Sequence, residues 1–249
     1  MKLKSEKIRK YLHFSAEIHL YDNIDSTNDE AKRRSKTDGG VCLYASQYQT
    51  KGRGRRGRSF YSPKDTGLYM TLSLPLAVSA ASVQKITCAA AVAVCEAVEA
   101  LSSQNPQIKW VNDIILYGKK VGGILTELLT DDKNQPYSVI VGIGLNLNTA
   151  VFPGEFADRA GNLGDIEVNA LCGSIANNLI YMYRDLSNNS ILEKYKQRSN
   201  CLGKIVAYDK EGIPHTARAV DIDADGGLVV EENGFISTLH SGEISVNLK

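Results

Sequence analysis

The sequence predicts an α+β protein, in which a mixed β-sheet with packed helices is followed by a small all-β barrel. β-rich runs and helical stretches alternate over the first 200 residues. Apolar residues surround one helical stretch from Ile86 to Val98, which predicts a buried central helix. From Gly203 onward the chain consists of short β runs separated by Gly and Asp turns. We therefore expect a large domain over residues 1–200 and a small β domain over residues 201–249.

The expected elements follow from local patterns. Thr27 with Glu30 fits a capping box, so a helix should start near residue 27 and stop before Gly39. Gly118 and Lys119 are expected to form a tight turn between two strands. Further helices are expected over 79–101, 170–183 and, more weakly, 191–195; strands are expected over 17–22, 41–48, 67–75, 108–110, 113–117, 120–129 and 137–147.

Composition excludes several classes of protein. The chain has 249 residues, of which 43% are hydrophobic and 23% charged, an ordinary globular composition. No window approaches 18 consecutive apolar residues, and the basic start lacks the apolar stretch of a signal peptide, so we expect a cytoplasmic protein without a membrane span. The five cysteines are odd in number and none are spaced CxxC, which favours reduced thiols over disulfides or zinc ligands.

Charge is unevenly distributed along the chain. The net charge is +1, but residues 1–60 carry 14 Lys and Arg against 7 Asp and Glu. A general nucleic-acid binder is usually basic overall. The pattern therefore favours a local site for an anion in the first part of the chain.

The strongest local signal is the octapeptide from Lys51 to Arg58, KGRGRRGR. Its glycines let the backbone approach a ligand, and its arginines offer planar forks for carboxylate or phosphate. Like charges repel, so we expect this loop to be mobile when no anion is bound. The octapeptide alone is as typical of an RNA-binding segment or a solvated surface loop as it is of an anion-binding loop. Its position between two buried strands, however, is not where a free RGG tail would lie.

Three further motifs have both a structural and a functional interpretation. KWVND at 109–113 with KKVGGIL at 119–125 is typical of an ordinary hairpin, or of a lysine beside a ligand that packs on bare backbone. Gly142 and Gly144 interrupt an apolar strand, which indicates a bulge or a ligand touching the backbone. This GxGxN segment lacks the features of a dinucleotide fingerprint. Residues 25–28, DSTN, cap a helix and expose groups that suit a small polar ligand.

Taken together and in this order, the four motifs resemble the biotin protein ligase family. DSTN, GRGRRGR, KWxND with KKxGGIL, and GIGLNLN, followed by a small β domain ending in GEIS, cover about residues 18–246. One departure is Val111, where the family usually has Pro. The resemblance implies a biotin/lipoate ligase-like catalytic domain over 1–200 and a C-terminal SH3-like barrel. It also implies an enzyme that joins biotin and ATP into biotinyl-5′-adenylate and then transfers the biotinyl group to a carrier lysine.

The resemblance also assigns site residues. Lys120, Arg53 and Arg55 are the implied catalytic residues, because they would offset the repulsion between a carboxylate and a triphosphate. The implied biotin-binding residues are Ser26, Thr27, Asn28, Gln49 (at the ureido ring), Arg53, Gly54, Arg55 and Lys120. The implied ATP- or adenylate-binding residues are Gly52, Arg56, Gly57, Arg58, Phe60 and Asn146 (both at adenine), Asn112 and Asp113. Mg²⁺ is the implied metal ion, with Asp113 as its ligand.

The implied partner is a biotin carboxyl carrier protein or domain, which supplies the acceptor lysine. This fits the lack of a Ser/His or Cys/His pattern. About 17 residues precede the matched region, so we expect the monofunctional form without an N-terminal winged helix, no operator DNA binding, no membrane binding, and a monomer or weak homodimer. One alternative is a lipoate or octanoate ligase or transferase of the same superfamily, although the R-R-x-x-G-G-G-x-V-x-H block of those enzymes is missing. A weaker alternative is a nucleic-acid-binding module using the Arg/Gly loop.

Overall fold

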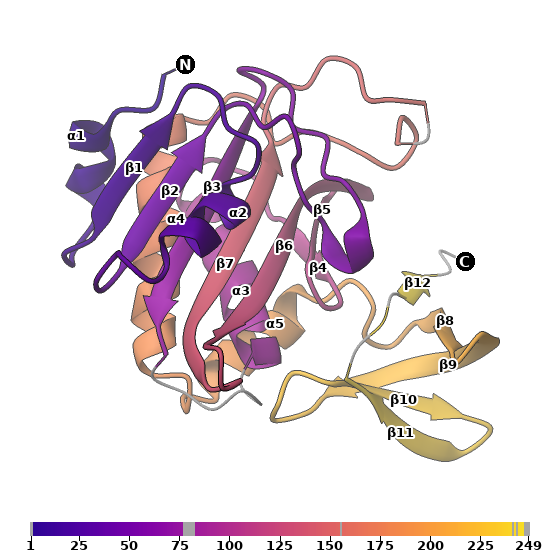
Figure 1. Ribbon diagram of the computed structural model, residues 1–249. Helices are drawn as coiled ribbons and strands as arrows, with labels where there is room; N and C mark the ends of the chain where they lie inside the picture. Colours follow the sequence, from indigo (N-terminus) through magenta and orange to yellow (C-terminus); the bar gives the residue numbers. More distant parts are fainter. Residues whose placement is uncertain (1, 77–82, 155, 241, 243, 247–249) are drawn as a thin grey trace.

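The computed structural model describes residues 2–76, 83–154, 156–240, 242 and 244–246. Its main feature is a seven-stranded mixed sheet (Figure 1). The strands, in spatial order, are β1 (Glu17–Tyr21), β2 (Cys42–Ser46), β3 (Gly67–Pro75), β7 (Pro136–Asn146), β6 (Lys119–Thr130), β5 (Asp113–Leu116) and β4 (Gln107–Lys109). Only β1 and β2 are parallel in this sheet, because a helix connects them.

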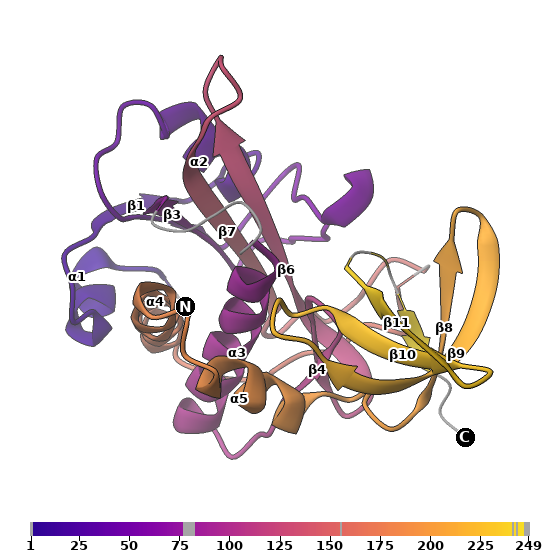
Figure 2. The same cartoon turned by 90° about the horizontal axis from the view of Figure 1, so that it is seen from below.

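Helices cover both faces of this sheet. The helices are α1 (Ser5–Ile8), α2 (Thr27–Arg34), α3 (Val83–Leu101), α4 (Val168–Arg184) and α5 (Ser190–Arg198). Figure 2 shows α3 and α4 on one face and α2 on the other. Because α3 lies between the sheet and α4, its residues from Ile86 to Val98, apart from Glu96, are buried all round. This confirms the predicted central helix.

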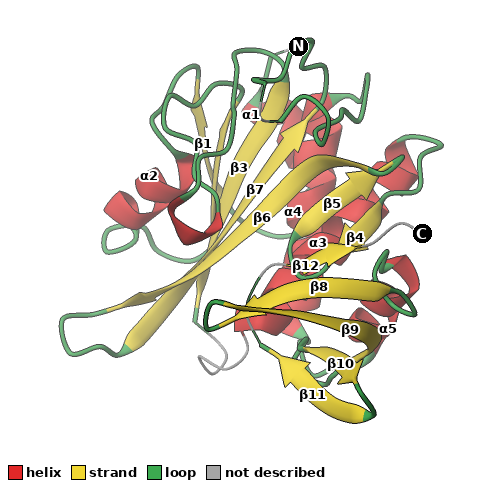
Figure 3. Cartoon of the chain, turned by 90° about the vertical axis from the view of Figure 1, so that its right-hand side faces the viewer, coloured by secondary structure: helices red, strands yellow, loops and turns green. Residues whose placement is uncertain are grey.

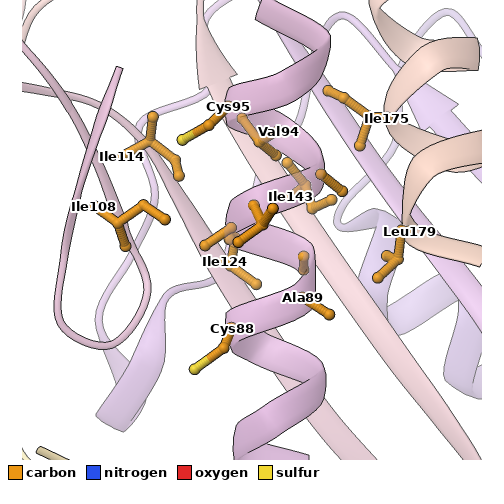
Figure 4. Packing of buried hydrophobic residues seen from close by; sticks show 14 of the residues in the cluster. Cys88, Ala89, Val94, Cys95, Ile108, Ile114, Ile124, Ile143, Ile175 and Leu179 are labelled. Carbon is orange, nitrogen blue, oxygen red and sulfur yellow. The ribbon is translucent and has the colours of Figure 1, made fainter. Parts of the chain in front are cut away.

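The packing of α3 explains its small side chains. Figure 4 shows Cys88 and Cys95 directed toward the β4–β5 side, where Ile108 and Ile114 lie, while α4 packs on another side of the helix. Small residues let the sheet and a second helix approach α3 closely.

All five cysteines are free, as predicted, and all five are also buried. Burial raises the pKa of the Cys95 and Cys172 thiols to about 12, so these thiols remain protonated and unreactive at neutral pH.

The C-terminal segment forms a second, five-stranded antiparallel sheet, consistent with the expected SH3-like barrel. Its strands are β8 (Ile205–Lys210), β9 (Ile213–Ile222), β10 (Leu228–Glu232), β11 (Phe235–Leu239) and β12 (Ile244–Val246), in the order β11-β10-β9-β8-β12. Figure 3 shows this sheet lying next to α5 and β4. Its inward-facing residues, such as Val206, Ala219 and Val230, join the same hydrophobic core as the large sheet.

The predicted start of a helix near residue 27 is confirmed by α2, whereas several other details differ from the prediction, each for a local reason. Ser26, not Thr27, is the N-cap of α2: its hydroxyl accepts from the Asp29 N–H, while Glu30 bonds Arg33 and Tyr21 instead of closing a capping box. The helix ends at Arg34, well before Gly39, and a hydrogen-bonded turn follows. The β5–β6 turn is Tyr117–Gly118, both with positive φ, so Lys119 already belongs to β6. The predicted helix residues 79–82 lie outside the described residues.

Among the described residues, no helix is both long enough and apolar enough to cross a lipid bilayer.

Candidate active site

The principal cavity has a volume of about 560 Å³, and residues of the large sheet and of the C-terminal sheet line it. Most of the site residues predicted from the sequence lie on its walls. These are Ser26, Thr27, Asn28, Gln49, Arg53, Gly54, Arg55, Arg58, Phe60, Asn112, Asp113, Lys120 and Asn146. Gly52, Arg56 and Gly57 do not line it; they face a smaller hollow on the other side of the 51–58 loop. A cavity of this size suits a ligand larger than a single metabolite ring.

One end of the cavity is built by the only parallel strand pair of the large sheet. Because β1 and β2 run in the same direction, the chain leaves both at the same edge, and Ile24 bridges Gln49. The Thr27 N–H then donates to Gln49 Oε1 at 2.8 Å, and Gln49 Nε2 donates to Ser62 Oγ at 3.1 Å. This end therefore holds a fixed set of neutral donors and acceptors, which suits a polar uncharged ring.

The start of α2 is fixed by an ion pair outside the cavity. Arg33 donates two hydrogen bonds to the Asp25 carboxylate, at 2.8 and 2.9 Å, and Asp25 in turn accepts from the Ser26 N–H at 2.7 Å. The hydrogen bonds from Arg33 lower the pKa of Asp25 to about 2. Asp25 thus remains a carboxylate and holds the N-terminus of the helix in place at all ordinary pH values.

Gly142 and Gly144 make room for side chains of other elements, and no bulge is present at either position. A Cβ on Gly142 would overlap the Asn28 amide. A Cβ on Gly144 would lie 2.7 Å from a ring carbon of Phe60. The predicted bulge is therefore wrong: these glycines let Asn28 and Phe60 pack flat on β7.

The arginines of the Arg/Gly loop form hydrogen bonds with other segments of the protein. Arg53 Nε donates to Asp29 Oδ2 at 2.7 Å, and Arg55 Nη1 donates to Asn112 Oδ1 at 3.0 Å. Both arginines also line the cavity. The loop thus places Arg53 and Arg55 at the cavity. Some of their N–H groups already donate hydrogen bonds within the protein.

Lys120 lines the same cavity. Its Nζ is 2.6 Å from Asp113 Oδ1 and 3.5 Å from the position that a Cβ on Gly123 would occupy. A Cβ on Gly123 would make only ordinary van der Waals contact with Lys120, so the interpretation of KKVGGIL as a lysine beside a ligand on bare backbone stays a prediction.

The cavity is predominantly positive. Besides the predicted cations, its lining includes Lys109, Arg159 and Lys204, whereas its described acidic residues are Asp113 and Asp158. Arg159 and Lys204 were missed because they lie in segments without a local motif, and only the fold brings them to the site. A positive cavity of this kind attracts a polyanion such as a triphosphate.

Trp110 was singled out in the sequence without a specific role. Its indole Nε1 donates to the Gly226 carbonyl at 3.0 Å, and Gln84 on α3 donates to the same oxygen. Gly226 lies in the turn between β9 and β10, so Trp110 ties the second sheet to the large one. The Trp110–Val111 peptide bond is cis.

The residues present fit a magnesium ion that arrives with a nucleotide. Mg²⁺ is usually held by one or two carboxylates together with substrate phosphates, and Asp113 supplies a carboxylate in the cavity, of which Oδ1 already pairs with Lys120 Nζ at 2.6 Å. Among the described residues, one cluster of three potential metal ligands is found, formed by Glu17, His19 and Cys42. It lies near the start of β1 and β2, whereas the cavity lies beyond the ends of these strands. Arg34 lies 3.9 Å from Glu17 there, which disfavours a cation.

Comparisons with known proteins agree with this geometry. Residues 20–146 match the Biotin/lipoate A/B protein ligase family, and residues 202–246 match the Biotin protein ligase C terminal domain. The Bifunctional ligase/repressor BirA of Bacillus spizizenii is 30% identical over 98% of this chain and 76% of its own length. The chain belongs to the biotin protein ligase family. The Biotin--[acetyl-CoA-carboxylase] ligase of Mycobacterium tuberculosis is likewise 30% identical to this ligase, over 92% of the chain and 88% of its own length.

Solved structures extend the likeness to the whole fold of this ligase. The biotin protein ligase from Aquifex aeolicus in complex with biotin and ATP is 27% identical, with a TM-score of 0.76, and the match covers 93% of this chain and 98% of that one. The biotin protein ligase from Leishmania major in complex with biotinyl-5-AMP is 25% identical, with a TM-score of 0.63, covering 90% and 99%. The fold class expected from the sequence is confirmed by these matches.

Proposed function

We propose that this ligase activates the carboxylate of biotin with ATP and then transfers the biotinyl group to a lysine of a biotin carboxyl carrier domain. The observation that carries the proposal is one cavity with two different ends. The neutral Thr27 and Gln49 end suits the ureido ring, and the cationic end around Lys120 and Arg55 suits a carboxylate beside phosphates.

In the first step, a carboxylate oxygen of biotin attacks the α-phosphorus of ATP, and pyrophosphate leaves. Both reactants are anions and repel each other. Lys120, Arg53 and Arg55 offset this repulsion and stabilise the charge that develops in the transition state. Asp113 would hold Mg²⁺, which supplies further charge neutralisation on the phosphates.

In the second step, the amine of the carrier lysine attacks the acyl carbon and AMP leaves. The ligase needs no nucleophile of its own, which agrees with its buried, protonated thiols. The mixed anhydride is sensitive to water, so the 51–58 loop has a second role in covering it. Phe60 on Gly144 and Asn146 form the wall proposed for adenine.

The remaining proposals concern partners and organisation. Residues 1–200 hold the catalytic machinery and residues 201–249 form the small β domain. The ligase acts as a cytoplasmic monomer or weak homodimer and binds no operator DNA. Of the alternatives, lipoate or octanoate ligation is not favoured, because the C-terminal segment matches a biotin ligase domain. The nucleic-acid module is weakened because Arg53 and Arg55 line the cavity.

Release of pyrophosphate is the direct test. It should require biotin and ATP together, and lipoate in place of biotin should not support it. Incorporation of labelled biotin into a purified carrier domain then tests the second step. Pyrophosphate release without biotin, or release supported equally by lipoate, would contradict the proposal.

A further inference from the structure

The Arg53 side chain is anchored by a carboxylate that lies outside the cavity. Its Nε donates to Asp29 Oδ2 at 2.7 Å, and among the described residues the Arg53 side chain has no other hydrogen-bond acceptor. Arg53 lines the cavity, whereas Asp29 is not part of the described lining. A ligand in the cavity can therefore contact Arg53 directly, but Asp29 can act on that ligand only through Arg53.

The contact with Asp29 leaves one edge of the guanidinium group available to a ligand. Arginine carries one N–H on Nε and two on each Nη, all in one plane. Because Nε donates to Asp29, the edge formed by Nη1 and Nη2 remains. Two parallel N–H groups on one edge can bind both oxygens of a carboxylate. Asp29 and a ligand carboxylate thus use different edges of the same side chain and do not compete for one of them.

Asp29 is itself held in place from two sides. Its N–H donates to the hydroxyl of Ser26, the N-cap of α2, at 3.4 Å. Its other carboxylate oxygen lies 3.9 Å from Lys32 Nζ, which in turn lies 2.6 Å from Glu127 Oε1 on β6. The Asp29 side chain is 18% exposed, and that of Arg53 is 54% exposed. The more buried carboxylate therefore gives the more exposed arginine a fixed point of attachment.

Different contacts fix the backbone and the side chain of Arg53. The backbone forms an isolated antiparallel bridge with Ser59, and the side chain contacts Asp29. Ordering one flexible side chain when a ligand binds lowers the affinity by about two- to tenfold. Without Asp29 the backbone bridge would remain, but the ligand itself would have to order the arginine.

The first turn of α2 therefore contacts both ends of the cavity. The Thr27 N–H donates to Gln49 at the neutral end, and two residues later Asp29 anchors Arg53 at the cationic end. We propose that Asp29 is a positioning residue that holds Arg53 ready for the carboxylate of biotin before biotin binds. This inference rests on the proposed function, which places the ureido ring at Thr27 and Gln49 and the carboxylate among the cations.

The test compares biotin with biotinol, in which an alcohol group replaces the carboxylate. Asp29→Ala removes the acceptor for Arg53 Nε, and Asp29→Asn keeps an oxygen acceptor without the charge. Asp22→Ala, whose carboxylate is 91% exposed, is the matched control. Binding of each ligand is measured by calorimetry, and KM and kcat are measured by pyrophosphate release.

We expect Asp29→Ala to weaken the binding of biotin by about five- to tenfold and that of biotinol by less than about twofold. Asp29→Asn should stay within about twofold of wild type for both ligands, because Nε keeps an acceptor. The KM for biotin should rise with the dissociation constant. The kcat at saturating biotin should change less than about threefold, because a bound carboxylate then orients Arg53. The control should match wild type throughout.

A double-mutant cycle tests whether Asp29 acts through Arg53. In an Arg53→Ala background, adding Asp29→Ala should not weaken the binding of biotin further. If Asp29→Ala folds poorly, Asp29→Ser, whose side chain is too short to take the place of the carboxylate, is used for the same measurements. Unchanged binding of biotinol shows that the neutral end is intact in each variant.

Three results would overturn the role of Asp29. An equal loss for biotin and biotinol would mean that Asp29 only supports the fold, and tighter binding of biotin by Asp29→Ala would mean that Asp29 competes with the ligand. A further loss in the Arg53→Ala background would mean that Asp29 acts by another route. Wild-type protein that releases no pyrophosphate with biotin and ATP would refute the proposed function instead.

Discussion

Lys120 Nζ lies 2.6 Å from Asp113 Oδ1 across the hairpin that joins β5 and β6. The two side chains are 41% and 23% exposed, so this ion pair adds little to the stability of the fold. We propose that the pair instead holds the Lys120 ammonium group in a defined place in the cavity until a substrate anion binds.

Lys120→Ala should slow biotin-dependent pyrophosphate release by about 10²–10³, because one donor at the reacting charge is lost. The near-UV circular dichroism should be unchanged. Lys119→Ala, a neighbouring exposed lysine outside the cavity lining, is the control and should keep the wild-type rate. A wild-type rate in Lys120→Ala would remove this lysine from the mechanism.

Asp113→Ala should raise the Mg²⁺ concentration needed for half-maximal pyrophosphate release by about tenfold, because a metal-binding carboxylate is lost. Titration of Mg²⁺ at constant ATP measures this. Asp132→Ala, whose carboxylate is 97% exposed, should leave the titration curve in place. Identical curves for Asp113→Ala and wild type would exclude Asp113 as a magnesium ligand.

The 51–58 loop should be cut quickly by trypsin in the free protein and at least tenfold more slowly with biotin and ATP. The loop contains five cations, and Arg53 remains 54% exposed despite its contact with Asp29, so a bound carboxylate and phosphate would supply further partners. Cleavage at the exposed Lys133 is the internal control. Equal rates with and without ligands would mean that the loop does not close over the site.

Gly142→Ala and Gly144→Ala should affect different substrates. The first displaces Asn28 and should raise the KM for biotin about tenfold, because overpacking a tight site costs about 1–3 kcal/mol. The second displaces Phe60 and should raise the KM for ATP to a similar extent. Gly39→Ala, with open space around it, should change neither. Equal effects of both variants on both substrates would contradict the division of the cavity into two ends.

The chain should not bind operator DNA. Between residues 2 and 16 the structure has one four-residue helix and one short 3-10 turn, whereas a helix-turn-helix needs two supported helices. Retention of DNA fragments at physiological salt, with and without biotin and ATP, measures this. Sequence-specific retention at nanomolar protein would refute the proposal that this chain binds no operator DNA.

The parts of the site that the sequence predicted well are those encoded locally. The motifs around Ser26, Arg53 and Lys120 each carry their chemistry within a few residues, and each lines the cavity. The buried helix α3 was equally evident, because its apolar residues surround the helix.

The parts that sequence could not predict depend on contacts between distant segments. The space above Gly142 and Gly144 is filled by Asn28 and Phe60, and nothing in the glycine pattern distinguishes a side chain from a ligand. Lys204 reaches the cavity only because the second sheet docks beside it. The misplaced helix cap reflects adjacent Ser26 and Thr27, both of which are good cap residues.

The anchoring of the second sheet through Trp110 affects the route by which substrates enter and products leave the cavity. The hydrogen bonds from Trp110 and Gln84 to Gly226, together with the Lys196–Asp221 ion pair, link this sheet to α3, to α5 and to the residue that follows β4, so we expect it to move less than the 51–58 loop. The segment before α4 is also tied down, because Lys120 exchanges backbone hydrogen bonds with Arg159 and Gly161. We therefore expect biotin and ATP to enter, and AMP to depart, past residues 51–58, which makes the opening rate of that loop an upper limit on turnover.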